Sequence, residues 1–249
     1  MLCLKELPEH SPVFRELAKA MSSLKFKVTT EICGAYHYVD TTSDWDTFYR
    51  EFLNPNNKEL LRQIRGAQRE KFNLSVEKVS KNIYPAFESA LAIYAKRRSS
   101  KGGYNPYHSE ERRGFVKAVI HAFEKKGKVE LNFLKDSDGN IWAFLLDWLH
   151  DGTRYHWNHA YNEEFKKYSP GKILIYMLME EGFKDPAIRA INHMRGSILH
   201  KGKLANKSEN LVAITIKNPY SRRIMGVGFT NPLVILHSKM AQAAKRTKR

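Results

Sequence analysis

The stretch 168–179, YSPGKILIYMLM, places a Ser-Pro-Gly-Lys sequence directly before a long apolar run. This pattern predicts a helix start, with Ser169 as the N-cap and Pro170 in the first turn. The first N–H groups of a helix have no partner within it, and the helix dipole adds partial positive charge, so such a start can bind phosphate. Gly171 would let a ligand approach the backbone, and Lys172 would add a full positive charge. The alternative interpretation is an ordinary capped helix.

The charge of the chain also favours an anionic partner. The 249 residues carry a formal net charge of +16, and no acidic residue follows Glu209. Such an imbalance is typical of proteins that bind a phosphate-bearing cofactor, a nucleic acid or a membrane surface. For the terminal run 245–249, KRTKR, a solvated surface that keeps the protein soluble is an equal alternative.

Metal chemistry is not expected from this sequence. The two cysteines, Cys3 and Cys33, form neither a metal-ligand motif nor a disulfide framework. His156 and His159 stand three apart in a stretch that has the pattern of a strand, where such positions face opposite sides. The chain has no signal-peptide pattern at its start and no apolar run of about 18 residues that could span a membrane. We therefore expect a soluble, cytoplasmic protein without a metal.

Hydrophobic periodicity and turn residues indicate the elements that must position these groups. In the first half we expect helices at 12–21, around 45–52, at 58–71 and at 81–98, and strands within 25–39 and at 72–79. In the second half we expect a helix at 110–126, a meander at 129–135, 141–149 and 154–161, the helix after Ser169, and strands at 187–193 and 211–217. Asp-Gly turns join the meander strands, which is a strong hairpin signal.

The order of helix, antiparallel meander, glycine loop, helix and strand resembles that of GNAT acyltransferases. The sequence is similar to one branch of them, the CelD-like (BioF-like) acetyltransferase domain family, which is related to the Fem peptidoglycan aminoacyltransferases. The similarity covers most of the chain and is carried by Phe115–His121, Gly127–Leu134, DGNIWAFLL, RYHWNHAYNEEFKKYSPGKILIYMLMEEG and INHMRGSILHKG.

The resemblance implies an α+β GNAT-like fold, with a mixed, mostly antiparallel sheet and helices on both faces. It also implies two regions. Residues 1–108 would be a partial first GNAT-like half with a helical linker, and residues 109–249 would be the C-terminal acyltransferase domain.

The resemblance further implies acetyl-CoA or another acyl-CoA as co-substrate, with its phosphates at Ser169, Pro170, Gly171 and Lys172. Arg195 and Lys201 resemble an Arg-Gly…Tyr-Lys signature whose lysine, in Fem relatives, faces the reacting groups and stabilises anionic charge.

Three more residues are candidates for proton transfer. His156 and Asp147 lie on the strands that flank the acyl position in GNAT folds, and either could take the proton of an attacking group. Tyr168 could donate to a departing thiolate. For each of them, plain packing or solvation on a strand or helix is the alternative interpretation.

Three functions remain open from the sequence. The first is an acyl-CoA-dependent N- or O-acyltransferase that acts by direct transfer to an unknown acceptor. The second is a Fem-like transferase that uses aminoacyl-tRNA, with Arg62, Arg65 and Arg69 binding the RNA backbone. The third is an inactive descendant that binds a nucleic acid or a protein partner. The oligomeric state is not predicted.

Overall fold

The computed structural model describes residues 1–100, 102, 105–195 and 203–218. Its strands are β1 (Leu2–Pro8), β2 (Lys27–Asp40), β3 (Ser75–Val79), β4 (Val129–Lys135), β5 (Ile141–His150), β6 (Thr153–Tyr161), β7 (Ala190–Arg195) and β8 (Lys207–Lys217). Its main helices are α1 (Pro12–Ser23), α4 (Lys58–Arg69), α5 (Ile83–Ser100), α6 (Glu110–Glu124) and α7 (Pro170–Lys184). Shorter helical segments are α2 (Trp45–Phe48), η1 (Tyr49–Leu53), α3 (Asn54–Asn56), η2 (Pro106–His108) and η3 (Glu163–Tyr168).

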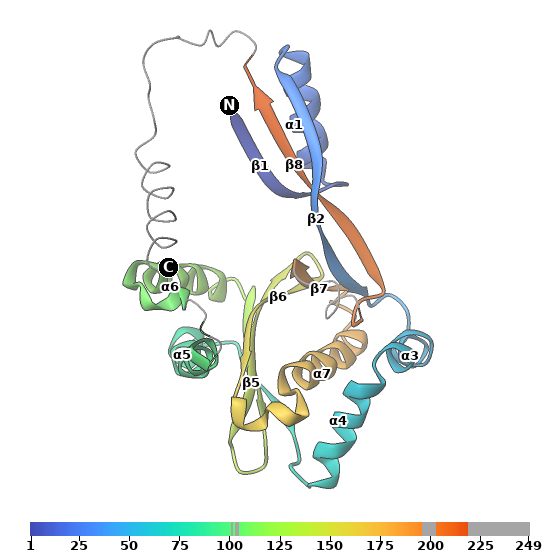
Figure 1. The fold of residues 1–249 in the computed structure, drawn as a ribbon, viewed down its shortest axis with the longest axis vertical. Coiled ribbons are helices and arrows are strands. Elements are labelled where there is room, and N and C mark those ends of the chain that lie inside the picture. Colours follow the sequence, from blue (N-terminus) through green and yellow to red (C-terminus); the bar gives the residue numbers. More distant parts are fainter. Residues whose placement is uncertain (101, 103–104, 196–202, 219–249) are drawn as a thin grey trace, which may run out of the picture.

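These strands form one sheet in the order β1-β8-β2-β7-β6-β5-β4-β3. Neighbouring strands are antiparallel, except that β6 and β7 are parallel. The long strands β2 and β8 extend from the body of the molecule into an arm, which also contains β1 and α1 (Figure 1). The mixed, mostly antiparallel sheet with its helices confirms the fold class expected from the sequence.

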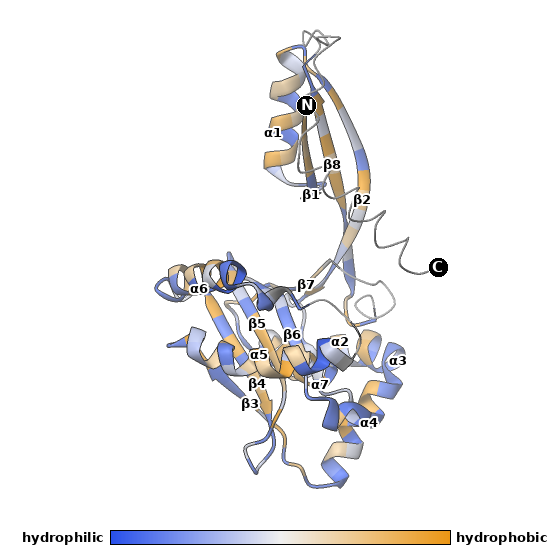
Figure 2. Ribbon diagram, turned by 60° about the vertical axis from the view of Figure 1, so that its left-hand side comes forward, coloured by the Kyte–Doolittle hydropathy of each residue, from blue (hydrophilic) through white to orange (hydrophobic). Residues whose placement is uncertain are grey.

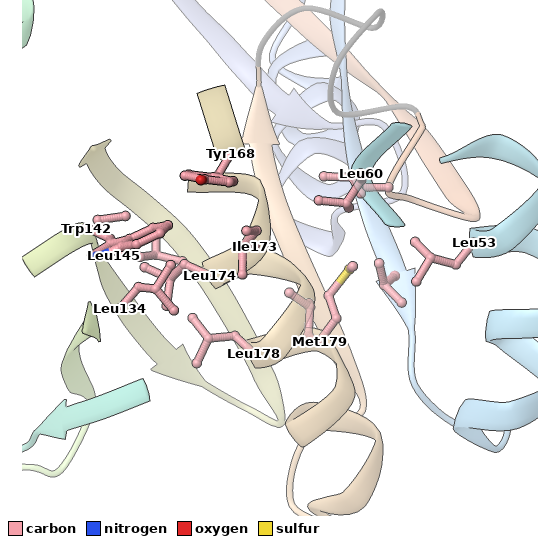
Figure 3. Close-up of a cluster of buried hydrophobic side chains, with 14 of the residues drawn as sticks. Leu53, Leu60, Leu134, Trp142, Leu145, Tyr168, Ile173, Leu174, Leu178 and Met179 are labelled. Carbon is pink, nitrogen blue, oxygen red and sulfur yellow. The ribbon is translucent and has the colours of Figure 1, made fainter. Parts of the chain in front are cut away.

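Helices cover both faces of the sheet in the body, so the body has two buried clusters. One cluster lies between the sheet and α7, with α2 and α4 packed beside it, and contains Trp142, Leu145, Leu174 and Leu178 (Figure 3). The other lies between the opposite face and α5 with α6, and contains Phe87, Ile120 and Phe144 among others. Figure 1 shows α5 with α6, and α7 with α4, on opposite sides of the sheet, and Figure 2 shows the body and the arm from another side.

Most elements lie where the sequence pattern predicts them, but the arm differs. β1 was not predicted, and β2 is one strand of 14 residues where two short runs were expected. Both strands pair with β8, which comes far later in the chain, so local pattern does not reveal them. Because β8 lies between β1 and β2, and β3 pairs with β4, strands from 1–108 and 109–249 share one sheet. The division into two regions stays a prediction. No helix in the described part of the chain is long and apolar enough to cross a membrane.

The turn between β4 and β5 depends on one carboxylate, that of Asp136. It accepts hydrogen bonds from the backbone N–H groups of Asp138 and Asn140, from the Asn140 side chain, and from the indole Nε1 of Trp142 at 2.9 Å. Burial raises the pKa of Asp136, but these hydrogen bonds outweigh it and hold the pKa below its usual value. Trp142 in turn stacks on Phe165 with ring centroids 4.1 Å apart, directly before the helix that begins at Pro170.

We predict that Asp136→Ala lowers the free energy of unfolding by about 2–3 kcal/mol, because it leaves the buried Trp142 N–H without an acceptor. The measurement is urea denaturation at pH 7, with the exposed neighbour Asp138→Ala as the control. Since the folded-state pKa is lowered, the stabilisation is complete above the unfolded pKa of about 4 and is lost as the pH falls through the folded value. The difference between wild type and variant should therefore shrink in acid, and a difference that grows would contradict this account.

Candidate functional site

The parallel pair β6–β7 is short, and the strands separate after it. Only three positions pair, namely Thr153 with Ala190, Arg154 with Ile191 and Tyr155 with Asn192. Beyond Tyr155, the β6 edge that faced β7 has no recorded ladder partner among the described residues. A wedge therefore opens between the two strands, and we call its narrow end, just after Tyr155 and Asn192, the vertex.

A β-bulge lies on β6 beside the vertex. The register with β5 moves from the pair Asp147–His156 to the pair Leu146–Asn158, so Trp157 is an extra residue without a partner of its own. Bulges of this kind bend a strand and redirect its backbone groups, and they are common next to active sites.

The start of α7 lies at the far end of β6. Ser169 occupies the N-cap position, as predicted, but has left-handed backbone angles (φ 52°, ψ 53°), and its side chain makes no capping hydrogen bond. A capping side chain needs an extended backbone at this position, which explains the difference from the expected cap. The Ser169 carbonyl instead accepts from the N–H groups of Lys172 and Ile173, at 2.8 and 3.3 Å. Pro170 has no N–H and is buried, so Gly171 presents the remaining backbone donor of the first turn.

The start of α7 lies against two aromatic rings of β6. A Cβ built on Gly171 would lie 3.7 Å from the Tyr161 ring and 4.0 Å from the His159 ring, which is ordinary contact. Gly171 and Lys172 are half-buried. The helix start is therefore next to the last residues of β6, at the wide end of the wedge.

Two arginines that the sequence analysis did not select lie near the same end of β6. Arg97 stacks over the Tyr161 ring at 4.1 Å and lies 3.8 Å from Glu163. Arg97 and Arg98, from the end of α5, line a cavity of about 260 Å³ together with Tyr94, His159 and Ala160. In the sequence, these two arginines are marked only by the basic run at the end of α5, and such runs usually form a solvated surface.

At the vertex, two histidines meet across the wedge. His156 of β6 and His193 of β7 have their Nδ1 atoms 3.0 Å apart, and their side chains are only 5% and 3% exposed. Sequence analysis selected His156 but missed His193. The signal was present only in the parallel register: Arg154 pairs with Ile191, so the residues two positions later also lie side by side.

Asp147 lies opposite His156 on β5 and is fully buried. Its Oδ2 accepts from the Asn132 side chain at 3.0 Å and lies 3.5 Å from Arg154 Nη1. Burial is the largest effect on this carboxyl and raises its pKa well above the usual value, while the positive charge of Arg154 opposes the rise. Arg154 is also buried and contacts Glu130 at 3.1 Å and Glu181 of α7 at 3.6 Å.

The remaining predicted residues are not all brought to the wedge. Tyr168 is buried in the cluster beneath α7, where its ring lies 5.3 Å from Trp142 and 5.5 Å from Phe72 (Figure 3). The backbone of Arg195 pairs with Tyr36 of β2, near the vertex. Lys201 lies outside the described residues. Within the described ranges, no group of three or more His, Cys, Asp or Glu side chains could hold a metal ion.

The arrangement matches known proteins at the level of fold. Among solved structures, a conserved protein of unknown function from Bacteroides thetaiotaomicron aligns with a TM-score of 0.59 at 14% identity, over 86% of this chain and 69% of that chain. FemX aligns with a TM-score of 0.56 at 11% identity, over 78% of this chain and 63% of FemX, so this chain spans less than two thirds of that protein. L-PGS from Bacillus licheniformis aligns with a TM-score of 0.53 at 13% identity, over 87% and 68% of the two chains. At these identities the likeness shows a shared fold alone.

A match to a family model identifies the family, which these structural likenesses alone do not. The model described as an acetyltransferase (GNAT) domain matches residues 56–201, which is more than half of the chain and includes β6, α7 and the vertex. The search of curated proteins found no match. The chain therefore belongs to the acetyltransferase (GNAT) domain family and is an acyltransferase of the GNAT type.

Proposed function

We propose that this protein transfers an acyl group from an acyl-CoA directly to an amine or a hydroxyl of an acceptor. One observation carries the proposal: the wedge between β6 and β7 has the uncapped start of α7 at its wide end and a buried histidine pair at its vertex. A donor that is anionic at one end and reactive at the other fits such a site.

The wide end would hold the phosphates of the donor. The Gly171 N–H and the positive end of the α7 dipole attract anionic groups, and Lys172 adds a full charge. Arg97 and Arg98 add two further cations on the other side of the end of β6. Among the residues that the structure describes, no strand pairs with β6 beyond Tyr155 on the wedge side, so its backbone can pair with the amide groups of the pantetheine arm.

The vertex would hold the thioester. The nucleophile of the acceptor attacks the thioester carbonyl carbon, a backbone N–H of the bulged segment 156–158 stabilises the oxyanion, and the C–S bond breaks with the electron pair leaving on sulfur. His156 takes the proton of the nucleophile, and the thiolate leaves and is protonated to the thiol. No covalent enzyme intermediate is needed.

A Fem-like reaction with aminoacyl-tRNA is the second candidate, and the surface of α4 favours it. Arg62, Arg65 and Arg69 are exposed, while Leu60, Leu61 and Ala67 of the same helix are buried. One Arg is already engaged, since Arg62 makes a two-pronged contact with Glu59 at 2.7 and 2.8 Å. Binding of tRNA that weakens steeply with salt, without binding of acyl-CoA, would favour this candidate.

We predict that acetyl-CoA raises the melting temperature of the wild-type protein and not that of Gly171→Trp. A ligand at 100 times its Kd adds about 2.7 kcal/mol of stability, which is a shift of roughly 5–10 °C for a chain of this size. The large side chain of the variant would fill the helix start and exclude the phosphates. Thermal-shift measurements with acetyl-, butyryl- and palmitoyl-CoA test this.

Gly171→Ala is the matched control for this measurement. Its Cβ would make only ordinary contacts with Tyr161 and His159, so the variant should keep most of the shift. If none of the three acyl-CoAs shifts the wild-type protein, the proposed donor is wrong.

We also predict that the double variant Cys3→Ser, Cys33→Ser keeps kcat within about twofold of wild type. Both thiols are exposed and lie on β1 and β2 in the arm, so direct transfer does not involve them. Steady-state release of free thiol from acetyl-CoA measures the rate. A covalently acylated cysteine, detected by mass spectrometry of the protein after incubation with acetyl-CoA alone, would argue against direct transfer.

A further inference from the structure

Four buried polar side chains lie in one row across the sheet, on the face that α7 covers. Asp147 of β5 lies opposite His156 of β6, which meets His193 of β7. His37 of β2 lies opposite His193, because the β2–β7 register has Tyr36 with Arg195 and Tyr38 with Asn192. The row thus runs through four adjacent strands, β5-β6-β7-β2.

Alternation along the strands places all four on the same face. Val39 and Ile191 are fully buried in the cluster beneath α7, and residues two positions away along a strand share a face. His37 and His193 therefore face α7. Leu145 is in the same cluster, which places Asp147 on this face as well.

The bulge between β2 and β7 explains how His37 comes beside His193. His193 and Met194 together lie opposite His37, and Met194 takes positive backbone angles (φ 57°) with its N–H donating to the Asn192 side chain at 2.7 Å. Met194 is the extra residue of β7 relative to β2. The bulge therefore lies at Met194, and His193 keeps its place in the row. A non-glycine residue at such angles costs energy and is held only by its surroundings.

The row is shielded from solvent. His37, His156 and His193 are 6%, 5% and 3% exposed, and Asp147 is 0% exposed. One Asp147 oxygen, Oδ1, is buried without a hydrogen-bond partner in the described part of the chain. Buried polar atoms are nearly always satisfied, so this oxygen is an acceptor that is still available within the row.

Charged groups surround the β5 end of the row. Arg154 contacts Asp147, Glu130 and Glu181, and Glu181 also pairs with Lys78. This network fixes the Asp147 carboxyl. The Asn132 side chain donates a hydrogen bond to Asp147 Oδ2, the oxygen that also lies next to Arg154. The end of the row at β5 is therefore rigid, while the histidines at β6, β7 and β2 are the groups that can exchange protons.

We propose that Asp147, His193 and His37 are positioning residues of a proton relay that serves His156. In the tautomer in which His156 Nδ1 donates to His193 Nδ1, a proton taken up at His156 Nε2 is matched by transfer of the Nδ1 proton to His193. The positive charge then moves from His156 of β6 to His193 of β7, and His37 of β2 stabilises it there. Asp147, directly opposite His156 on β5, sets the polar surroundings of its ring.

This inference rests on the proposed function for its catalytic meaning, but its geometry can be tested without activity. A shared Nδ1–H between two imidazoles should give a downfield proton resonance correlated with ring nitrogens in the ¹⁵N-labelled protein. The resonance should disappear in both His156→Phe and His193→Phe and persist in His121→Gln, which changes an exposed histidine on α6. Absence of the resonance from the folded wild-type protein, or its survival in either Phe variant, overturns the relay.

Activity supplies the second test. With acetyl-CoA saturating, His193→Phe should lower kcat about 100-fold or more, His37→Phe about 10-fold, and His121→Gln less than twofold, while all three keep the wild-type thermal shift with acetyl-CoA. The kcat of the wild type should show a curved dependence on the D₂O fraction, as several protons move together, and His37→Phe should make it closer to linear.

The two failures are distinguishable. If His193→Phe keeps kcat within threefold of wild type while acetyl-CoA still binds, the relay is wrong and the proposed function stands. If acetyl-CoA fails to shift the wild-type protein, the proposed function is wrong, and the resonance alone then decides whether the histidines share a proton.

Discussion

The three-rung ladder between β6 and β7 is the constraint on which the site depends. Parallel strands cannot be joined by a tight turn, so the chain crosses over through η3 and α7 before it returns as β7. Each of the two strands also pairs with an antiparallel neighbour on its other side. β6 pairs with β5 along nearly the whole length of β6, and β7 pairs with β2. Because those antiparallel partners diverge, the parallel ladder ends after Tyr155 and Asn192. The same separation that weakens the sheet there leaves strand backbone available to a ligand.

Close packing of α7 holds the two sides of the wedge in place. A Cβ on Gly182 would lie 2.7 Å from Ile191 Cδ1, so a larger residue there would require the Ile191 side chain to shift. At its other end α7 begins beside Tyr161 of β6, and near its middle Leu178 and Met179 are buried against the sheet. One helix thus touches both strands of the wedge and also begins at its wide end. Glu181 of α7 contacts Arg154, and Arg154 contacts Asp147 of the polar row, so the helix is connected to that row.

The parts predicted from sequence are those that depend on local pattern. The meander, its Asp-Gly turn at Asp151 and Gly152, where both residues take positive φ, and the start of α7 at Pro170 follow from residue types and spacing. β1 was missed because its partner, β8, is distant in the chain. The same reason applies to the site. The helix start is a local feature and was found, whereas His193 and His37 become neighbours of His156 only through a parallel register and a bulge, which no single segment encodes.

The place of β8 between β1 and β2 has a consequence for the newly made chain. Tyr36 of β2 donates a hydrogen bond to Glu209 of β8, 173 positions later. At a synthesis rate of roughly 5–20 residues per second, Tyr36 leaves the ribosome about 9–35 s before Glu209, and the residues of β1 leave earlier still. Until then Leu4 of β1 and Val28 of β2 lack the strand that lies between them, so the arm is completed last.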